Sequence, residues 1–157
     1  MKNELKQELT RRLCECNNGG LVLVMYDIYF GFSEDVKAAL ASNDRAALKK
    51  AVADVQAALD ELIGALDFKY PLAGQLYPLY SYCKRLFSTV LYSLDVSVVN
   101  EADSIMKKLR NSFETAAADD KSAPLMDNAQ KVYAGMTYGR GRLTESFIND
   151  DNRGFLA

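Results

Sequence analysis

Apolar residues recur every three or four positions along most of the chain, which is the spacing of one face of an α-helix. Five segments carry this pattern, and polar or glycine-containing stretches separate them. The predicted helices span residues 2–16, 20–41, 44–66, 72–94 and 97–117. No strand-like alternation competes with them, so we predict an all-α protein.

Four of the predicted helices contain about 20 residues, and each is therefore about 30 Å long. Short connections join them, which predicts an antiparallel four-helix bundle. The segment 2–16 adds an extra short N-terminal helix. We expect residues 1–118 to form this helical bundle domain. Residues 119–157 contain Pro124 and four glycines, and we predict a flexible C-terminal extension with a short helix across Leu125–Met136.

Several residues predict where the helices begin and bend. The side chain of Asn43 is a candidate N-cap for the helix over 44–66, because it can accept a hydrogen bond from the first turn. Asp95 or Ser97 is expected to cap the helix over 97–117. Pro78 lies inside the helical pattern of 72–94, and it lacks the amide hydrogen that would bond the carbonyl of Gly74. It therefore predicts a kink or a loose first turn.

The third predicted helix has one clearly apolar stripe and one charged face. Its stripe consists of Leu48, Val52, Val55, Leu59, Leu62 and Leu66. Such a helix buries the stripe and exposes the opposite face to water. Residues 20–41 and 72–94 differ, because they carry more apolar residues than one stripe holds.

In those two segments we expect one stripe to enter the core and a second to remain. The expected core stripes are Leu21, Met25, Ile28, Phe32 and Val36 in the first, and Leu72, Leu76, Leu79, Cys83, Leu86, Val90 and Leu94 in the second. The remaining aromatic residues are predicted to bind a partner: Tyr26, Tyr29, Phe30, Tyr77, Tyr80, Tyr82 and Phe87. Two interpretations stay open: other parts of an assembly cover the second stripe permanently, or it forms a groove for an amphipathic peptide helix.

Composition narrows the class of partner. The chain has 49% hydrophobic and 25% charged residues and a net charge of −2, which gives no general attraction to nucleic acid or to an anionic membrane. No apolar run approaches the roughly 18 residues of a membrane span, so we expect no membrane insertion. The charged start of the chain does not resemble a secretion signal. We expect a cytoplasmic protein.

Signals of catalysis are weak. The chain contains no histidine, which excludes His-based nucleophile pairs and imidazole metal ligands. Cys14, Cys16 and Cys83 are expected to be small, partly buried thiols. Residues 137–143, TYGRGRL, present Arg140 and Arg142 in a glycine-rich loop. This loop is interpreted as a linker with solvated arginines, with contact to RNA or phosphate as the alternative. We expect no enzyme activity, metal or cofactor.

Four stretches together resemble a known family: LVLVMYDIYFGF, LDELIGALDF, LYPLYSYCKRLF and SLDVSVVNEADSIMKKLRNSF. In this order and spacing, across about residues 18–113, they resemble the flagellar export chaperones of the FliS family. The resemblance implies a helical bundle without enzymatic activity. It implies binding of the disordered C-terminal segment of flagellin in the cytoplasm, which prevents premature polymerisation and keeps flagellin competent for flagellar type III export. Flagellar export gate components are further expected partners.

The family pattern extends to particular positions of this chain. They are Met25, Tyr26 and Asp27, then Leu66 and Asp67, and then Leu76, Tyr77, Tyr80 and Tyr82. Of these, Met25, Leu66 and Leu76 fit the expected core stripes. The chain departs from the family pattern at both ends, with a charged, leucine-spaced first helix and a long C-terminal tail.

An open apolar groove invites self-association, so we expect a segment of the chain to shield it. Leu5, Leu9 and Leu13 of the first helix, or apolar residues of the tail, are the candidates for such a plug. We expect a monomer or a weak dimer. A self-associating structural or adaptor bundle without a flagellin client is the alternative, and a nucleic-acid adaptor that uses Arg140 and Arg142 is the third hypothesis.

Overall fold

The protein is an all-α bundle, as the apolar spacing predicts. The structure is a computed structural model that describes residues 3–125. Its helices are α1 (Asn3–Glu15), α2 (Asn18–Ala41), α3 (Arg45–Gly64), α4 (Pro71–Ser93) and α5 (Val96–Ala118). The helix predicted across Leu125–Met136 and the loop over 137–143 lie outside the described residues.

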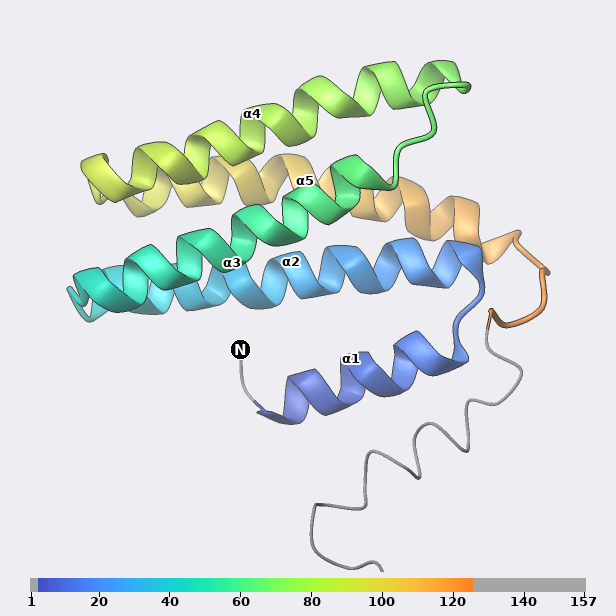
Figure 1. Cartoon of the computed structure of the whole chain (residues 1–157), viewed down its shortest axis with the longest axis horizontal. Helices are drawn as coiled ribbons and strands as arrows, with labels where there is room; N and C mark the ends of the chain where they lie inside the picture. The colour runs from blue at the N-terminus through green and yellow to red at the C-terminus, as the bar shows by residue number, and fades with distance from the viewer. Residues whose placement is uncertain (1–2, 126–157) are drawn as a thin grey trace, which may run out of the picture. The chain divides into compact units, whose positions relative to one another are not determined.

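Helices α2 to α5 form an antiparallel four-helix bundle (Figure 1). In this bundle α2 packs against α3 and α5, and α4 packs against the same two helices from the opposite side. The shorter α1 lies outside the bundle and packs against α2. Helix α2 therefore has neighbours on three sides, which explains why its sequence is apolar over most of its circumference.

Helices α2, α3 and α5 begin with side-chain N-caps, and the cap of α5 was predicted. Asn17 accepts a hydrogen bond from the Gly20 amide at the start of α2, and Asp95 accepts one from Ser97 at the start of α5. The prediction for α3 is wrong by one residue, because Asp44 caps it by accepting from two amides. Asn43 instead adopts a left-handed conformation with φ of 54°, which asparagine tolerates better than most residues.

Helix α4 starts with Pro71 at its first turn and continues through Pro78 to Ser93. Proline suits the first position of a helix, since the amide there has no partner within the helix. Pro78 removes one intrahelical hydrogen bond but does not end the helix.

The core confirms the predicted stripe of α3 and revises those of α2 and α4. Leu48, Val52, Val55, Leu59 and Leu62 are buried, as predicted. Leu66, the last residue of the predicted stripe, lies beyond the end of α3 and is half-buried. On α2 the buried face consists of Val24, Tyr26, Tyr29, Gly31, Ser33, Val36 and Ala39. On α4 it consists of Ala73, Leu76, Tyr80, Cys83, Phe87 and Val90. In both helices, several aromatic residues that were predicted to lie at the surface are buried in the core.

Candidate partner-binding surface

Four of the seven residues predicted to face a partner lie in the core. Tyr26, Tyr29 and Phe87 are fully buried, and only 2% of Tyr80 is exposed. The expectation that they form an exposed second stripe is wrong. The rings interlock across the bundle, with Tyr29 edge-on to Phe87 and Tyr26 6.4 Å from Tyr80 between ring centroids. Burial of these large rings stabilises the bundle more than burial of the smaller residues beside them would.

Two of the buried hydroxyls satisfy each other. The hydroxyl oxygens of Tyr26 and Tyr80 are 2.6 Å apart. Burial is the main cause that raises the pKa of both phenols above the ordinary value of 10. Both side chains are therefore protonated at neutral pH and available as hydrogen-bond donors.

A second, partly buried network joins α2 to α5 through Asp103. Its carboxylate accepts hydrogen bonds from Tyr29 at 3.0 Å and from Ser33 at 2.8 Å, and it pairs with Lys37 at 2.7 Å. Burial, followed by the charge of Asp103, raises the pKa of Tyr29 above its ordinary value. The network explains how Ser33, which is polar and fully buried, is accommodated in the core.

The other three predicted residues remain accessible, but they lie on different parts of the surface. Tyr77 is exposed on α4 and packs edge-on against Phe68 in the α3–α4 connection. Tyr82 is half-buried, and its hydroxyl donates to Glu101 of α5 at 2.6 Å. Phe30 is half-buried on α2, in a groove that α1 partly covers.

Helix α1 covers this part of α2 through one apolar contact region and one ion pair. Leu9 and Cys14 are buried, whereas Leu5 and Leu13 are partly exposed. Arg12 pairs with Asp27 of α2 at 2.7 Å, and Asp27 also pairs with Arg110 of α5 at 2.7 Å. Because Asp27 has two cationic partners, it keeps one of them if α1 moves away.

The turn between α1 and α2 is held by the segment after α5. Asp120 accepts a hydrogen bond from the Gly19 amide at 3.1 Å, and its carbonyl accepts one from Asn17. The amide of Leu125 donates to the carbonyl of Cys16 at 3.0 Å. These bonds raise the cost of moving α1, since the turn and the end of α5 must separate together.

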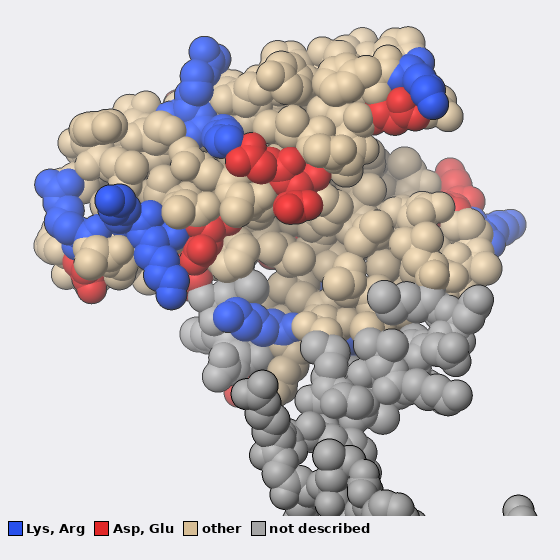
Figure 2. Space-filling model, in the orientation of Figure 1, with Lys and Arg blue, Asp and Glu red and all other residues tan. Residues whose placement is uncertain are grey.

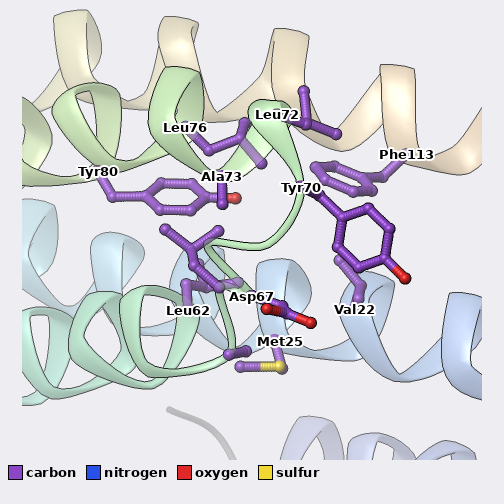
Figure 3. A pocket seen from close by; sticks show the side chains of 12 residues that line it. Val22, Met25, Leu62, Asp67, Tyr70, Leu72, Ala73, Leu76, Tyr80 and Phe113 are labelled. Carbon is purple, nitrogen blue, oxygen red and sulfur yellow. The ribbon is translucent and has the colours of Figure 1, made fainter.

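An apolar recess opens at the end of the bundle where α3 and α4 connect. Figure 3 shows side chains from four helices around it, with Val22 and Met25 of α2 opposite Leu76 and Tyr80 of α4. Leu62 of α3 and Phe113 of α5 complete its inner wall. The recess has a volume of about 280 Å³, and Asp67 is the charged residue among its lining side chains.

Exposed apolar side chains continue from the recess onto the outside of the bundle. We call the following residues, with their exposed fractions, the α3–α4 surface: Phe68 (63%), Tyr70 (67%), Leu72 (53%) and Tyr77 (46%). Figure 2 shows the molecule hollowed at this end, with mostly uncharged side chains around the hollow. Tyr70 and Leu72 line the recess, whereas Phe68 packs against Tyr77, which lines a separate hollow. Exposed apolar areas are typical of partner-binding sites.

Sequence reasoning missed three residues of this surface. Phe68 and Tyr70 lie in the stretch DFKYP, between the helices predicted over 44–66 and 72–94, and Leu72 was assigned to the core. A signal was present, since two aromatic residues in a connection of this length exceed what a solvated turn requires. The face that Leu72 adopts could not be predicted, because it depends on the phase of the whole helix.

Other kinds of site find little support in the described part of the chain. Among residues 3–125, no group of three or more Cys, Asp or Glu side chains is placed to hold a metal ion. No helix in that range is long and apolar enough to cross a membrane. Burial raises the pKa of the Cys83 thiol to about 12, so it is a poor nucleophile at neutral pH.

Comparison with known proteins supports the resemblance. The family described as flagellar protein FliS matches residues 1–120, which covers α1 to α5 and ends at Asp120. A search of curated proteins finds no match. The chain therefore belongs to the FliS family of flagellar proteins.

Proposed function

We propose that the protein is a cytoplasmic export chaperone for flagellin. It binds the disordered C-terminal segment of flagellin, prevents premature polymerisation, and keeps the subunit competent for flagellar type III secretion. Membership of the FliS family supports a general role as a flagellar chaperone. The observation that carries the finer proposal is the α3–α4 surface, which exposes three aromatic rings and a leucine next to an apolar recess.

The energetics favour a long contact with an unstructured client. Burial of apolar area contributes about 25 cal/mol per Å². Each client residue that becomes ordered opposes binding by about 1–2 kcal/mol of backbone entropy. A single docked side chain would not offset the ordering of its neighbours, so the client segment must cover the recess and further apolar residues beyond it.

We also propose that the chain shields a client-binding groove on α2, and the position of helix α1 supports this. Of the other helices, α1 packs against α2 alone, and the groove beneath it contains Phe30. Its buried Leu9 occupies the position that an apolar client residue would take. We propose that α1 leaves this face of α2 when the client binds.

A polymerisation assay tests the function. Stoichiometric amounts of the full chain should prevent purified flagellin monomers from forming filaments. A Tyr77→Glu, Leu72→Glu variant should lose this effect while its helical circular dichroism stays unchanged, because both side chains are already exposed. Tyr92→Glu is the matched control, since Tyr92 is 87% exposed at the other end of α4. Filament growth that the unmodified chain does not slow would contradict the proposal.

The α3–α4 surface also supports the alternative of self-association, because exposed apolar areas of two copies can cover each other. Sedimentation at micromolar concentration separates the two hypotheses. A tight dimer that ignores flagellin favours the self-associating bundle, whereas a monomer that gains mass with flagellin favours the chaperone.

A further inference from the structure

The bond between Tyr26 and Tyr80 leaves one hydroxyl proton without an acceptor. Each phenol carries one proton, and a single bond between the two oxygens uses only one of them. Among residues 3–125, no further acceptor bonds either hydroxyl, although both side chains are almost completely buried. A buried donor without an acceptor destabilises the folded state. The spare proton therefore needs an acceptor from outside the described side chains.

The surroundings of the two rings indicate which proton is spare. Tyr26 packs against Phe113 and Tyr80 and does not line the recess, whereas Tyr80 does. If Tyr80 were the donor, the proton of Tyr26 would lie in the closed core. If Tyr26 donates, the proton of Tyr80 can point into the recess. Figure 3 shows the Tyr80 hydroxyl directed toward the middle of the lining side chains.

The size and charge of the recess limit what it can hold. A volume of about 280 Å³ is near the lower limit of pockets for small molecules and cofactors, which span roughly 300–1,000 Å³. No Lys or Arg among residues 3–125 lines the recess, and its lining includes the carboxylate residue Asp67. An anionic group such as a phosphate or a free carboxylate is therefore disfavoured. A small, uncharged apolar group with a hydrogen-bond acceptor fits the volume of the recess, its charge and the free proton of the Tyr80 hydroxyl.

One residue of a peptide chain has this combination, since its side chain can be apolar and its main-chain carbonyl is a strong acceptor. We propose that the recess binds a bulky aliphatic residue of the client segment, whose side chain contacts Met25 and Leu76 and whose carbonyl accepts a hydrogen bond from the Tyr80 hydroxyl. The identity of the client rests on the proposed function. The selection of an uncharged aliphatic residue rests on the recess itself.

Two tyrosine variants separate the roles of the hydroxyls. Tyr80→Phe and Tyr26→Phe both remove the bond between the rings, so both should lower stability. Only Tyr80→Phe removes the donor that faces the recess. Tyr26→Phe is therefore the matched control, because it removes the same hydrogen bond between the rings but keeps the hydroxyl that faces the recess.

Methyl NMR of methionine-labelled full-length protein provides the readout. Met25 lines the recess, and Met106 is fully buried in the core and serves as an internal reference. The probes are N-acetyl-leucinamide, which carries one leucine side chain and carbonyl acceptors, and a peptide of the flagellin C-terminal segment. Both should shift the Met25 signal saturably and leave Met106 in place. Tyr26→Phe should change the affinity of N-acetyl-leucinamide less than twofold, and Tyr80→Phe should weaken it about tenfold, the upper range for one hydrogen bond.

A third variant tests the recess independently, in case the tyrosine variants do not fold. Ala73→Leu places a larger side chain at the wall of the recess and keeps both hydroxyls. It should abolish the N-acetyl-leucinamide shift at Met25 while the helical circular dichroism remains.

The outcomes distinguish this inference from the proposed function. Equal weakening by both tyrosine variants, or an unmoved Met25 signal with N-acetyl-leucinamide, would overturn the inference. A flagellin peptide that binds without moving Met25 would overturn it too, and the chaperone function would stand. If N-acetyl-leucinamide binds as expected and the flagellin peptide does not, the chemistry of the recess is supported and the flagellin client is rejected.

Discussion

Hydroxyl groups decide which face of α2 and α4 enters the core. A tyrosine ring can lie at the surface or in the core. Burial is favourable when the hydroxyl group has a hydrogen-bond partner. Tyr26 finds Tyr80 on another helix, and Tyr29 finds Asp103, which is 74 positions away in the sequence. The spacing of apolar residues contains no information on such pairs, so Tyr26, Tyr29, Tyr80 and Phe87 were assigned to the surface although they lie in the core.

Asp103 should therefore matter more to stability than an ordinary surface carboxylate. Asp103→Ala leaves the hydroxyls of Tyr29 and Ser33 without their acceptor, and we expect it to lower the free energy of unfolding by about 2–4 kcal/mol. Urea denaturation followed by circular dichroism measures this change. Ser104→Ala, at the exposed neighbouring position, should change it by less than about 0.5 kcal/mol. A similar small change for both variants would contradict the role assigned to Asp103.

The buried tyrosines also predict a loss of stability in alkali. Their pKa values are raised in the folded protein above the ordinary value of 10, so the unfolded chain releases these protons first. Their contribution is complete below about pH 10 and falls as the pH rises above that value, by up to about 1.4 kcal/mol per pH unit for each tyrosine. Urea denaturation at pH 9 and pH 11 should show a smaller difference for Tyr29→Phe than for the unmodified chain. The exposed Tyr92 provides the control, and an equal reduction by Tyr92→Phe would refute this prediction.

At the scale of the helices, the accuracy of the sequence-based predictions follows from how many neighbours a helix has. Helix α3 has one solvent-exposed face, so the buried residues from Leu48 to Leu62 could be predicted individually. Helix α2 is packed by α1, α3 and α5, and several phases of its apolar residues fit equally well. The boundaries of all five described helices were predicted to within about two residues, because capping and turn residues act locally.

The junction of α2 with α5 depends on a close approach at Gly19. A Cβ atom built on Gly19 would lie 3.0 Å from the Cβ of Ala117 and 3.2 Å from a carboxylate oxygen of Asp120. Gly19→Ala should therefore separate the start of α2 from the end of α5 and lower the midpoint of thermal unfolding. Hydrogen exchange should also become faster in α1, because the Gly19 amide bonds Asp120.

Gly74→Ala is the matched control for this substitution. A Cβ atom at Gly74 would meet nothing within 4 Å, and alanine favours a helix over glycine by about 0.5–1 kcal/mol. This variant should be as stable as the unmodified chain or slightly more so. If Gly19→Ala behaved in the same way, the close approach would have no structural importance.

At the scale of the whole molecule, the proposed function gives α1 a role in client binding. Deletion of residues 1–17 removes the Arg12–Asp27 ion pair and uncovers Phe30, while Asp27 keeps Arg110 as a partner. We expect the shortened chain to remain helical and to bind a flagellin peptide more tightly, or to form oligomers through the uncovered face. Unchanged affinity and an unchanged sedimentation coefficient would show that α1 is a permanent part of the fold and not a plug.

The fold class could be predicted from the sequence as a whole, but the location of the exposed surface could not. Apolar spacing and short connections were sufficient for an all-α bundle. The four residues of the α3–α4 surface lie within positions 68–77, but the recess beside them is lined by side chains of α2, α3, α4 and α5, which are distant in the sequence. Of the predicted partner residues, Tyr77 lies on this surface and Tyr80 faces the recess from inside.

The central claim is that this bundle captures the unstructured C-terminal segment of flagellin, and calorimetric titration of the full chain with that segment tests it most directly. We predict saturable binding of one peptide per chain with a negative heat-capacity change, the signature of buried apolar surface, and a gain of helical circular dichroism in the mixture. A peptide of the same composition in scrambled order should produce no such signal. Absence of binding at peptide concentrations up to about 100 μM, a threshold that corresponds to roughly 5.5 kcal/mol, would contradict the account.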